Sequence, residues 1–240
     1  MRTLDDMLKP LVSRASALRV QKASAPLSRI ASKFGGVPYL ESGEAWPQCQ
    51  TCKRPLSFIC QLDLRETSHP ARDRIPFFTF FYCWNCFPGG PPGGEQGEWV
   101  VRKYANPGES KAVAIQPPGQ VEHASECSVS FSECLSLPDW DGADLWCPDA
   151  GDLCCEVNNE APWEEYRAAV ERIAGEQEIQ SRVGGYPHWI QGEATPDKAE
   201  FLAQIDSKHD AGIMWGDVGC VYLFLSKGSE PRVSLNLQCC

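Results

Sequence analysis

The sequence predicts an α+β fold made of two diverged copies of one antiparallel β-sheet module. We expect the copies to be related by pseudo-two-fold symmetry, each preceded by a helix. Two 16-residue segments align without a gap, matched apolar runs follow them, and a segment with helical spacing precedes each. We therefore predict a first repeat over residues 1–115, an acidic irregular insert over 116–160 and a second repeat over 161–240, packed as one compact unit.

The first predicted element is an amphipathic helix over residues 3–19. Apolar residues recur along it at helical spacing, namely Leu4, Met7, Leu8, Leu11, Val12, Ala15 and Leu18. Pro10 limits or kinks this helix, because proline removes a backbone donor and clashes with the preceding turn. Residues 20–31 are expected to connect the helix to the first sheet module.

The repeat itself is the strongest organisational signal. It opens with SKFGGVPYLESGEAWP at 32–47 and SRVGGYPHWIQGEATP at 181–196, which are identical at 8 of 16 positions. The match resumes in FICQLD at 58–63 and FLAQID at 201–206, and β-rich segments follow at 75–82 and 219–226. Ordered matches over this much sequence rarely arise by chance, so we predict internal duplication.

Residues that both copies share are interpreted as scaffold. Gly35-Gly36 and Gly184-Gly185 permit positive φ or a close backbone approach. Gln61 and Gln204 lie at matched places in predicted strands, where a buried amide usually bonds neighbouring backbone groups. A catalytic role for these glutamines is the alternative.

Between the copies the sequence changes character several times. The Gly- and Pro-rich stretch at 87–97 is predicted to be a mobile loop. Short strands are expected at 98–104 and 112–115. A second helix is predicted over 162–180, because a proline and then two glutamates occupy its first turn and an apolar stripe follows.

Cys49-Gln-Thr-Cys52 and Cys83-Trp-Asn-Cys86 form a candidate metal site. Each CxxC can form a turn with both thiolates on one side, and two such turns supply the four tetrahedral ligands of a structural zinc. A site with four protein ligands has no open position, so it would not be catalytic. The second copy is 6 residues shorter here and has no CxxC. The alternative is that these are unrelated thiols.

Charge is distributed unevenly around a formal net charge of -10. No Lys or Arg occurs between Lys111 and Arg167, a stretch that contains 12 acidic residues. They are Glu122, Glu126, Glu133, Asp139, Asp141, Asp144, Asp149, Asp152, Glu156, Glu160, Glu164 and Glu165. One interpretation is a solvated face and the other is a docking surface for a cationic partner. We expect no nucleic-acid binding, since phosphates would be repelled.

The expected compartment is the cytoplasm, and no membrane partner is expected. The N-terminal residues contain Asp5 and Asp6 and lack the apolar core of a signal peptide. No apolar run approaches the roughly 20 residues that span a bilayer. The 13 cysteines, an odd number, therefore fit reduced thiols with a metal site better than a disulfide framework.

The motifs FGGVPYLESGEAWP, CQTCKRPLSFICQLDL, GGYPHWIQGEA, FLAQIDS and MWGDVGCVYLFLS resemble the YwqG-like family of bacterial proteins of unknown function. The resemblance covers most of residues 30–105 and 180–240. It implies an α+β fold with internal duplication and, because such genes often neighbour polymorphic toxin genes, an immunity protein. The first half also resembles programmed-cell-death-2 type proteins, which implies chaperoning of a basic client.

Three functions follow as hypotheses. The first is a non-enzymatic immunity protein that binds and neutralises a toxin domain with a basic surface. The second is a chaperone-like holder of a basic client protein. The third is an enzyme with an unrecognised site between the copies, to which Asp217 or Gln204 would contribute, although Asp217 in the stretch Gly216-Asp-Val-Gly219 is typical of a turn. We predict no catalytic residues and no cofactor other than zinc.

Overall fold

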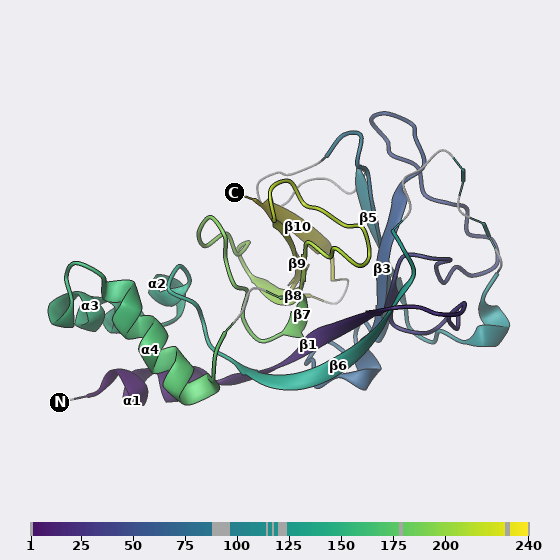
Figure 1. Cartoon of the computed structure of the whole chain (residues 1–240). Coiled ribbons are helices and arrows are strands. Elements are labelled where there is room, and N and C mark those ends of the chain that lie inside the picture. The colour runs from purple at the N-terminus through teal and green to yellow at the C-terminus, as the bar shows by residue number, and fades with distance from the viewer. Residues whose placement is uncertain are drawn as a thin grey trace.

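A computed structural model describes residues 2–87, 97–113, 115–116, 118–119, 124–177, 180–228 and 231–239. These residues form mainly antiparallel sheet with few helices, which confirms the predicted α+β class. Ten strands make one sheet in the order β10-β9-β8-β7-β1-β6-β2-β3-β4-β5, and the sheet curls until it is nearly closed, like a barrel (Figure 1). Apart from its two end residues, the loop predicted at 87–97 lies outside the described residues.

A long two-stranded ribbon forms the middle of the sheet. β1 (Ser13–Lys22) and β6 (Cys127–Ser136) pair antiparallel over their whole length, from Ser13 opposite Ser136 to Lys22 opposite Cys127. In Figure 1 the ribbon runs from the helices at one end of the molecule towards the curled sheet. β6 lies within residues 116–160, so the expectation that this stretch is irregular was wrong.

The prediction of a helix over residues 3–19 was also wrong beyond the first turns of that segment. α1 spans Leu4–Leu8 and begins at a capping box in which Thr3 and Asp6 bond each other's backbone N–H. A 3-10 turn at Lys9–Leu11 contains Pro10 and ends the helical segment. The chain then enters β1, because Ala15–Leu18 are buried and their backbone groups pair with strands on both sides.

The remaining strands extend the ribbon on either side. On the β6 side lie β2 (Lys33–Phe34), β3 (Ser57–Asp63), β4 (Phe77–Tyr82) and β5 (Trp99–Tyr104). On the β1 side lie β7 (Arg182–Gly184), β8 (Ala199–Asp206), β9 (Cys220–Ser226) and β10 (Val233–Gln238). The strands predicted around Gln61 and Gln204 and those predicted at 75–82, 98–104 and 219–226 are therefore confirmed. At 112–115 only an isolated bridge between Ala112 and Glu41 occurs among the described residues.

Gln61 and Gln204 both clamp a loop to a strand through their buried amides. Gln61 Oε1 accepts from the Tyr39 N–H at 2.8 Å, and its Nε2 donates to the Ala31 carbonyl at 2.7 Å. Gln204 Oε1 accepts from the His188 N–H at 2.9 Å, while its Nε2 donates to the carbonyl of residue 180 at 2.8 Å. These bonds agree with the predicted structural role for both side chains.

The shared glycines stand where another residue would not fit. Gly35 has φ +56°, and a Cβ on it would lie 2.1 Å from the Ala124 carbonyl oxygen. Gly185 has φ +70°, and a Cβ there would lie 2.6 Å from the Ser136 side chain. Both glycines therefore meet the two conditions predicted for them, positive φ and close approach.

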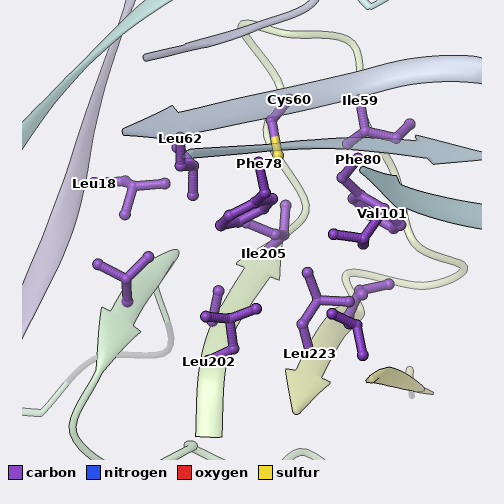
Figure 2. Close-up of a cluster of buried hydrophobic side chains, with 14 of the residues drawn as sticks. Leu18, Ile59, Cys60, Leu62, Phe78, Phe80, Val101, Leu202, Ile205 and Leu223 are labelled. Carbon is purple, nitrogen blue, oxygen red and sulfur yellow. The ribbon is translucent and has the colours of Figure 1, made fainter. Parts of the chain in front are cut away.

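Side chains from both halves of the chain fill the interior of the curled sheet. Leu62 and Phe78 on β3 and β4 face Leu202 and Ile205 on β8, with Leu223 of β9 beside them (Figure 2). All of these side chains are essentially inaccessible to solvent. Burial of this shared core makes each half a packing surface for the other.

Helices form a separate layer at the free end of the ribbon (Figure 1). α2 (Ala143–Trp146) and α3 (Pro148–Val157) lie in the stretch expected to be irregular, and α4 (Pro162–Ala174) follows. With α1 they enclose a second core that includes Leu8, Cys154 and Tyr166. The helix predicted over 162–180 ends at Ala174, because Gly175 takes φ +81°. No helix among the described residues is long and apolar enough to cross a membrane.

Candidate metal centre

The structure brings the four predicted cysteines together. Cys49 and Cys52 lie in the loop that leads into β3, and Cys83 and Cys86 directly follow β4. Cys49 Sγ is 3.7 Å from Cys86 Sγ, and Cys52 Sγ is 3.6 Å from Cys83 Sγ. All four sulfur atoms lie within 4.8 Å of one another, so they could hold a metal ion. This is the one such cluster of cysteine, histidine and carboxylate ligands in the part of the chain that the structure describes.

The two CxxC turns have the same backbone geometry. In each, the N–H of the second cysteine donates to the sulfur of the first, at 3.5 Å for Cys52 and 3.4 Å for Cys86. The residue after each pair donates its N–H to the first cysteine's carbonyl at 2.9 Å, and takes positive φ: 63° at Lys53 and 45° at Phe87. Positive φ is strained for these residue types, so the turns need the packing around them.

The sulfur spacing fits a tetrahedral metal. Zinc–sulfur bonds of about 2.3 Å place tetrahedral thiolates about 3.8 Å apart, near the shorter separations here. A disulfide would need sulfurs about 2 Å apart, and all four cysteines are free thiols. The Arg54 N–H lowers the pKa of Cys52 to about 7, whereas burial raises the pKa of Cys83 to about 12. A bound cation would hold the buried thiol in its thiolate form.

The cysteine cluster lies where the ends of several segments meet. Gln50 donates its N–H to the Gly97 carbonyl at 2.7 Å, and Cys83 donates to the Glu98 carbonyl at 2.9 Å, just before β5 begins. Cys49 and Cys83 are buried in a small core with Leu56, Phe58 and Phe81. The cysteines therefore join the entry of β3, the exit of β4 and the entry of β5.

The residues named for an enzyme do not gather at one site. Gln204 is buried in β8 and bonded to backbone at both ends of its amide. Asp217 lies in an exposed turn between Gly216 and Val218, which both have positive φ, so the turn interpretation is confirmed. Cys60 and Cys220 are buried within β3 and β9, as predicted for small core side chains.

The helical layer carries a second feature that sequence reasoning missed. A cavity of about 360 Å³ opens beside α4, and its walls include Trp140, Trp163, Tyr166 and Trp189. Asp139 also lines it, and burial raises the pKa of this carboxyl to about 7. These residues come from three separate segments, so no local spacing in the sequence signals the cavity.

Comparison with known protein families finds a match over most of the chain. Residues 32–229 match the model of a family described as a domain of unknown function (DUF1963). The chain belongs to this family. The DUF1963 match contains all four cysteines and the helices α2, α3 and α4, so both sites lie within the domain. The central strand β1 and the edge strand β10 lie outside the matched range although they belong to the same sheet. No curated protein matches the chain.

Proposed function

We propose that this protein is a non-enzymatic binding protein that recognises a folded protein with a basic surface, and that it neutralises a toxin domain as an immunity protein. The observation that carries the proposal is the helical layer, where the same helices and turns expose both acidic side chains and aromatic or aliphatic ones. Protein interfaces combine aromatic anchors with a charged rim in this way.

The acidic half of this surface comes from α2, α3, α4 and the turns between them. Its exposed acids are Asp141, Asp144, Asp149, Asp152, Glu156, Glu160 and Glu164. No Lys or Arg occurs between Lys111 and Arg167 in the sequence. Their summed field attracts a basic protein surface and accelerates its association.

Large apolar side chains on the same helices are exposed to solvent. Trp146 and Trp163 are each 47% exposed, Leu145 is 53% exposed and Val157 is 65% exposed. Exposed tryptophan is costly in water and is enriched among the residues that dominate binding energy. An acidic surface with apolar anchors suits the basic active cleft of a toxin such as a nuclease, and it disfavours nucleic acid itself.

We further propose that the four cysteines form a structural metal site and that the metal is zinc. Four thiolate ligands at tetrahedral spacing favour zinc and leave no position for a substrate.

We also propose that the chain arose by internal duplication with pseudo-two-fold symmetry. From the central ribbon outwards, β1 is followed by β7, β8, β9 and β10, and β6 by β2, β3, β4 and β5. Matched β-bulges at Phe58/Cys60 and at Phe201/Ala203 support this origin.

The test is co-purification with each protein encoded beside its gene, at low and moderate salt. We expect one folded partner to be retained, with affinity that falls as salt rises, because the attraction is between exposed charges. Retention of an isolated basic tail but not of the folded domain would instead support a chaperone-like holder. Recovery of none of these partners at either salt concentration would refute the proposal.

A further inference from the structure

The cavity beside α4 has the chemistry of a cation site. Its walls include four large aromatic side chains: Trp140 and Tyr166 meet edge to face with ring centroids 5.7 Å apart, and Trp163 and Trp189 also line it. Trp189 is buried, whereas Trp163 is 47% exposed to solvent. The faces of aromatic rings carry negative potential and attract a cation within about 6 Å, with tryptophan the strongest.

The carboxyl group of Asp139 lines the same cavity. Asp139 Oδ1 accepts from the Gly142 N–H at 2.9 Å, and Oδ2 accepts from the Trp189 N–H at 2.6 Å. Each carboxylate oxygen has two acceptor positions, so these bonds leave capacity for a further donor. Asp141 adds a second, exposed carboxylate to the cavity lining.

Two arginines and one histidine lie near these carboxylates. Arg182 Nη2 lies 3.3 Å from His188 Nδ1, and because a guanidinium can only donate, this nitrogen accepts and the imidazole is neutral. Arg167 also lines the cavity, but its side chain is 68% exposed and lies 3.9 Å from Glu171. Asp139 and Asp141 therefore share the cavity lining with the exposed cation of Arg167, and Asp139 also lies within the electrostatic reach of Arg182.

We propose that this cavity receives one arginine or lysine side chain from the partner protein, held between the aromatic walls and Asp139. The inference rests on the proposed function, because a partner must present that side chain. The acidic surface around the opening favours a basic partner. The volume of about 360 Å³ falls in the range of small-ligand sites, so a long side chain can be enclosed.

The first experiment uses a blocked arginine, N-acetyl-arginine amide, titrated into the full chain while indole N–H signals are followed by NMR. Blocked citrulline, which has nearly the same shape without the charge, is the control ligand. We expect arginine to shift the signals of Trp140, Trp163 and Trp189, and citrulline to shift them far less. Equal shifts from both ligands, or none from either, would overturn the inference.

Matched variants locate the site. Trp163→Ala should weaken arginine binding about tenfold, the size expected for loss of a cation–π wall. Trp146→Ala is the control, since Trp146 is equally exposed on the same helical layer but lies outside the cavity. Equal affinities in the two variants would contradict the assignment, and Asp141→Asn should weaken binding without disturbing the fold.

The outcomes also separate this inference from the proposed function. If arginine binds but no partner protein is found, the cavity stands as a cation site and the proposed function fails. If a partner protein binds with the same affinity to Trp163→Ala and to the unmodified chain, the function stands and the cavity assignment fails.

Discussion

At the residue scale, His69 links the two halves of the sheet. Its Nδ1 accepts from the Ala71 N–H at 2.9 Å, so the proton lies on Nε2, which faces the Phe201 carbonyl of β8 at 3.3 Å. The side chain is almost fully buried, and burial lowers the pKa of His69. Protonation would place an N–H on Nδ1 against the Ala71 N–H, so the charged form opposes folding.

We predict that acid destabilises the protein through this histidine. The folded state binds fewer protons than the unfolded state once the pH falls below the ordinary histidine pKa of about 6.5, so the free energy of unfolding decreases there. His69→Asn keeps an acceptor where Nδ1 stands but does not titrate. Urea unfolding at about pH 7.5 and about pH 5.5 should show a larger loss in the unmodified chain than in this variant. Equal losses would exclude His69 as the cause.

Residues of the metal centre could be predicted and residues of the cavity could not, for a physical reason. Two thiolates of one CxxC are brought together by a local turn, so the spacing of Cys49 and Cys52 indicates their chemistry directly. Trp140, Trp163 and Trp189 meet only because α4 packs beside the ribbon and the loop after β7. No local sequence pattern predicts that packing.

At the element scale, helix propensity predicted the wrong secondary structure for a segment whose two faces are both buried. Ala15 and Leu18 favour helix and have helical spacing, yet tertiary pairing with β6 and β7 makes them part of a central strand. β6 did carry a signal, since Cys127, Val129 and Phe131 alternate with serines. α3 contains Asp, Gly and two cysteines, which are weak helix formers. The main sequence signal for this helix is Pro148 at its first position.

The helical layer yields a prediction about where a partner binds. Asp152, Glu156 and Glu160 are exposed acids on α3 and the turn after it. Changing all three to Lys should weaken binding of a basic partner by about tenfold or more at low salt, because attraction becomes repulsion.

The matched control changes Asp73, Asp210 and Asp217 to Lys, which alters the net charge equally on exposed loops away from the helices. This variant should bind almost normally when affinity is measured by calorimetry at the same salt concentration. If both triple variants lose the same affinity, net charge rather than the helical layer governs binding, and the proposed surface is wrong.

At the scale of the whole molecule, the repeat predicted the modules but not how they join. Residues 32–47 and 181–196 indicate matched strands, and β3 with β4 and β8 with β9 are where expected. The joining strands β1 and β6 pair across more than 100 residues of sequence, from Ser13 to Ser136, and neither carries the repeat motifs. Long-range pairing of this kind depends on core packing, which spacing rules do not capture.

The metal centre is the part of the whole-molecule account that a single measurement tests most directly. The measurement is the zinc content of the purified chain, determined together with its free energy of unfolding before and after chelation. We predict about one zinc per chain, and a loss of several kcal/mol when it is removed. Cys83→Ser should lose the zinc and that stability, whereas Cys60→Ser, a buried cysteine of β3 outside the cluster, should retain one zinc per chain. A metal-free chain whose stability does not respond to chelator or to Cys83→Ser would contradict the account.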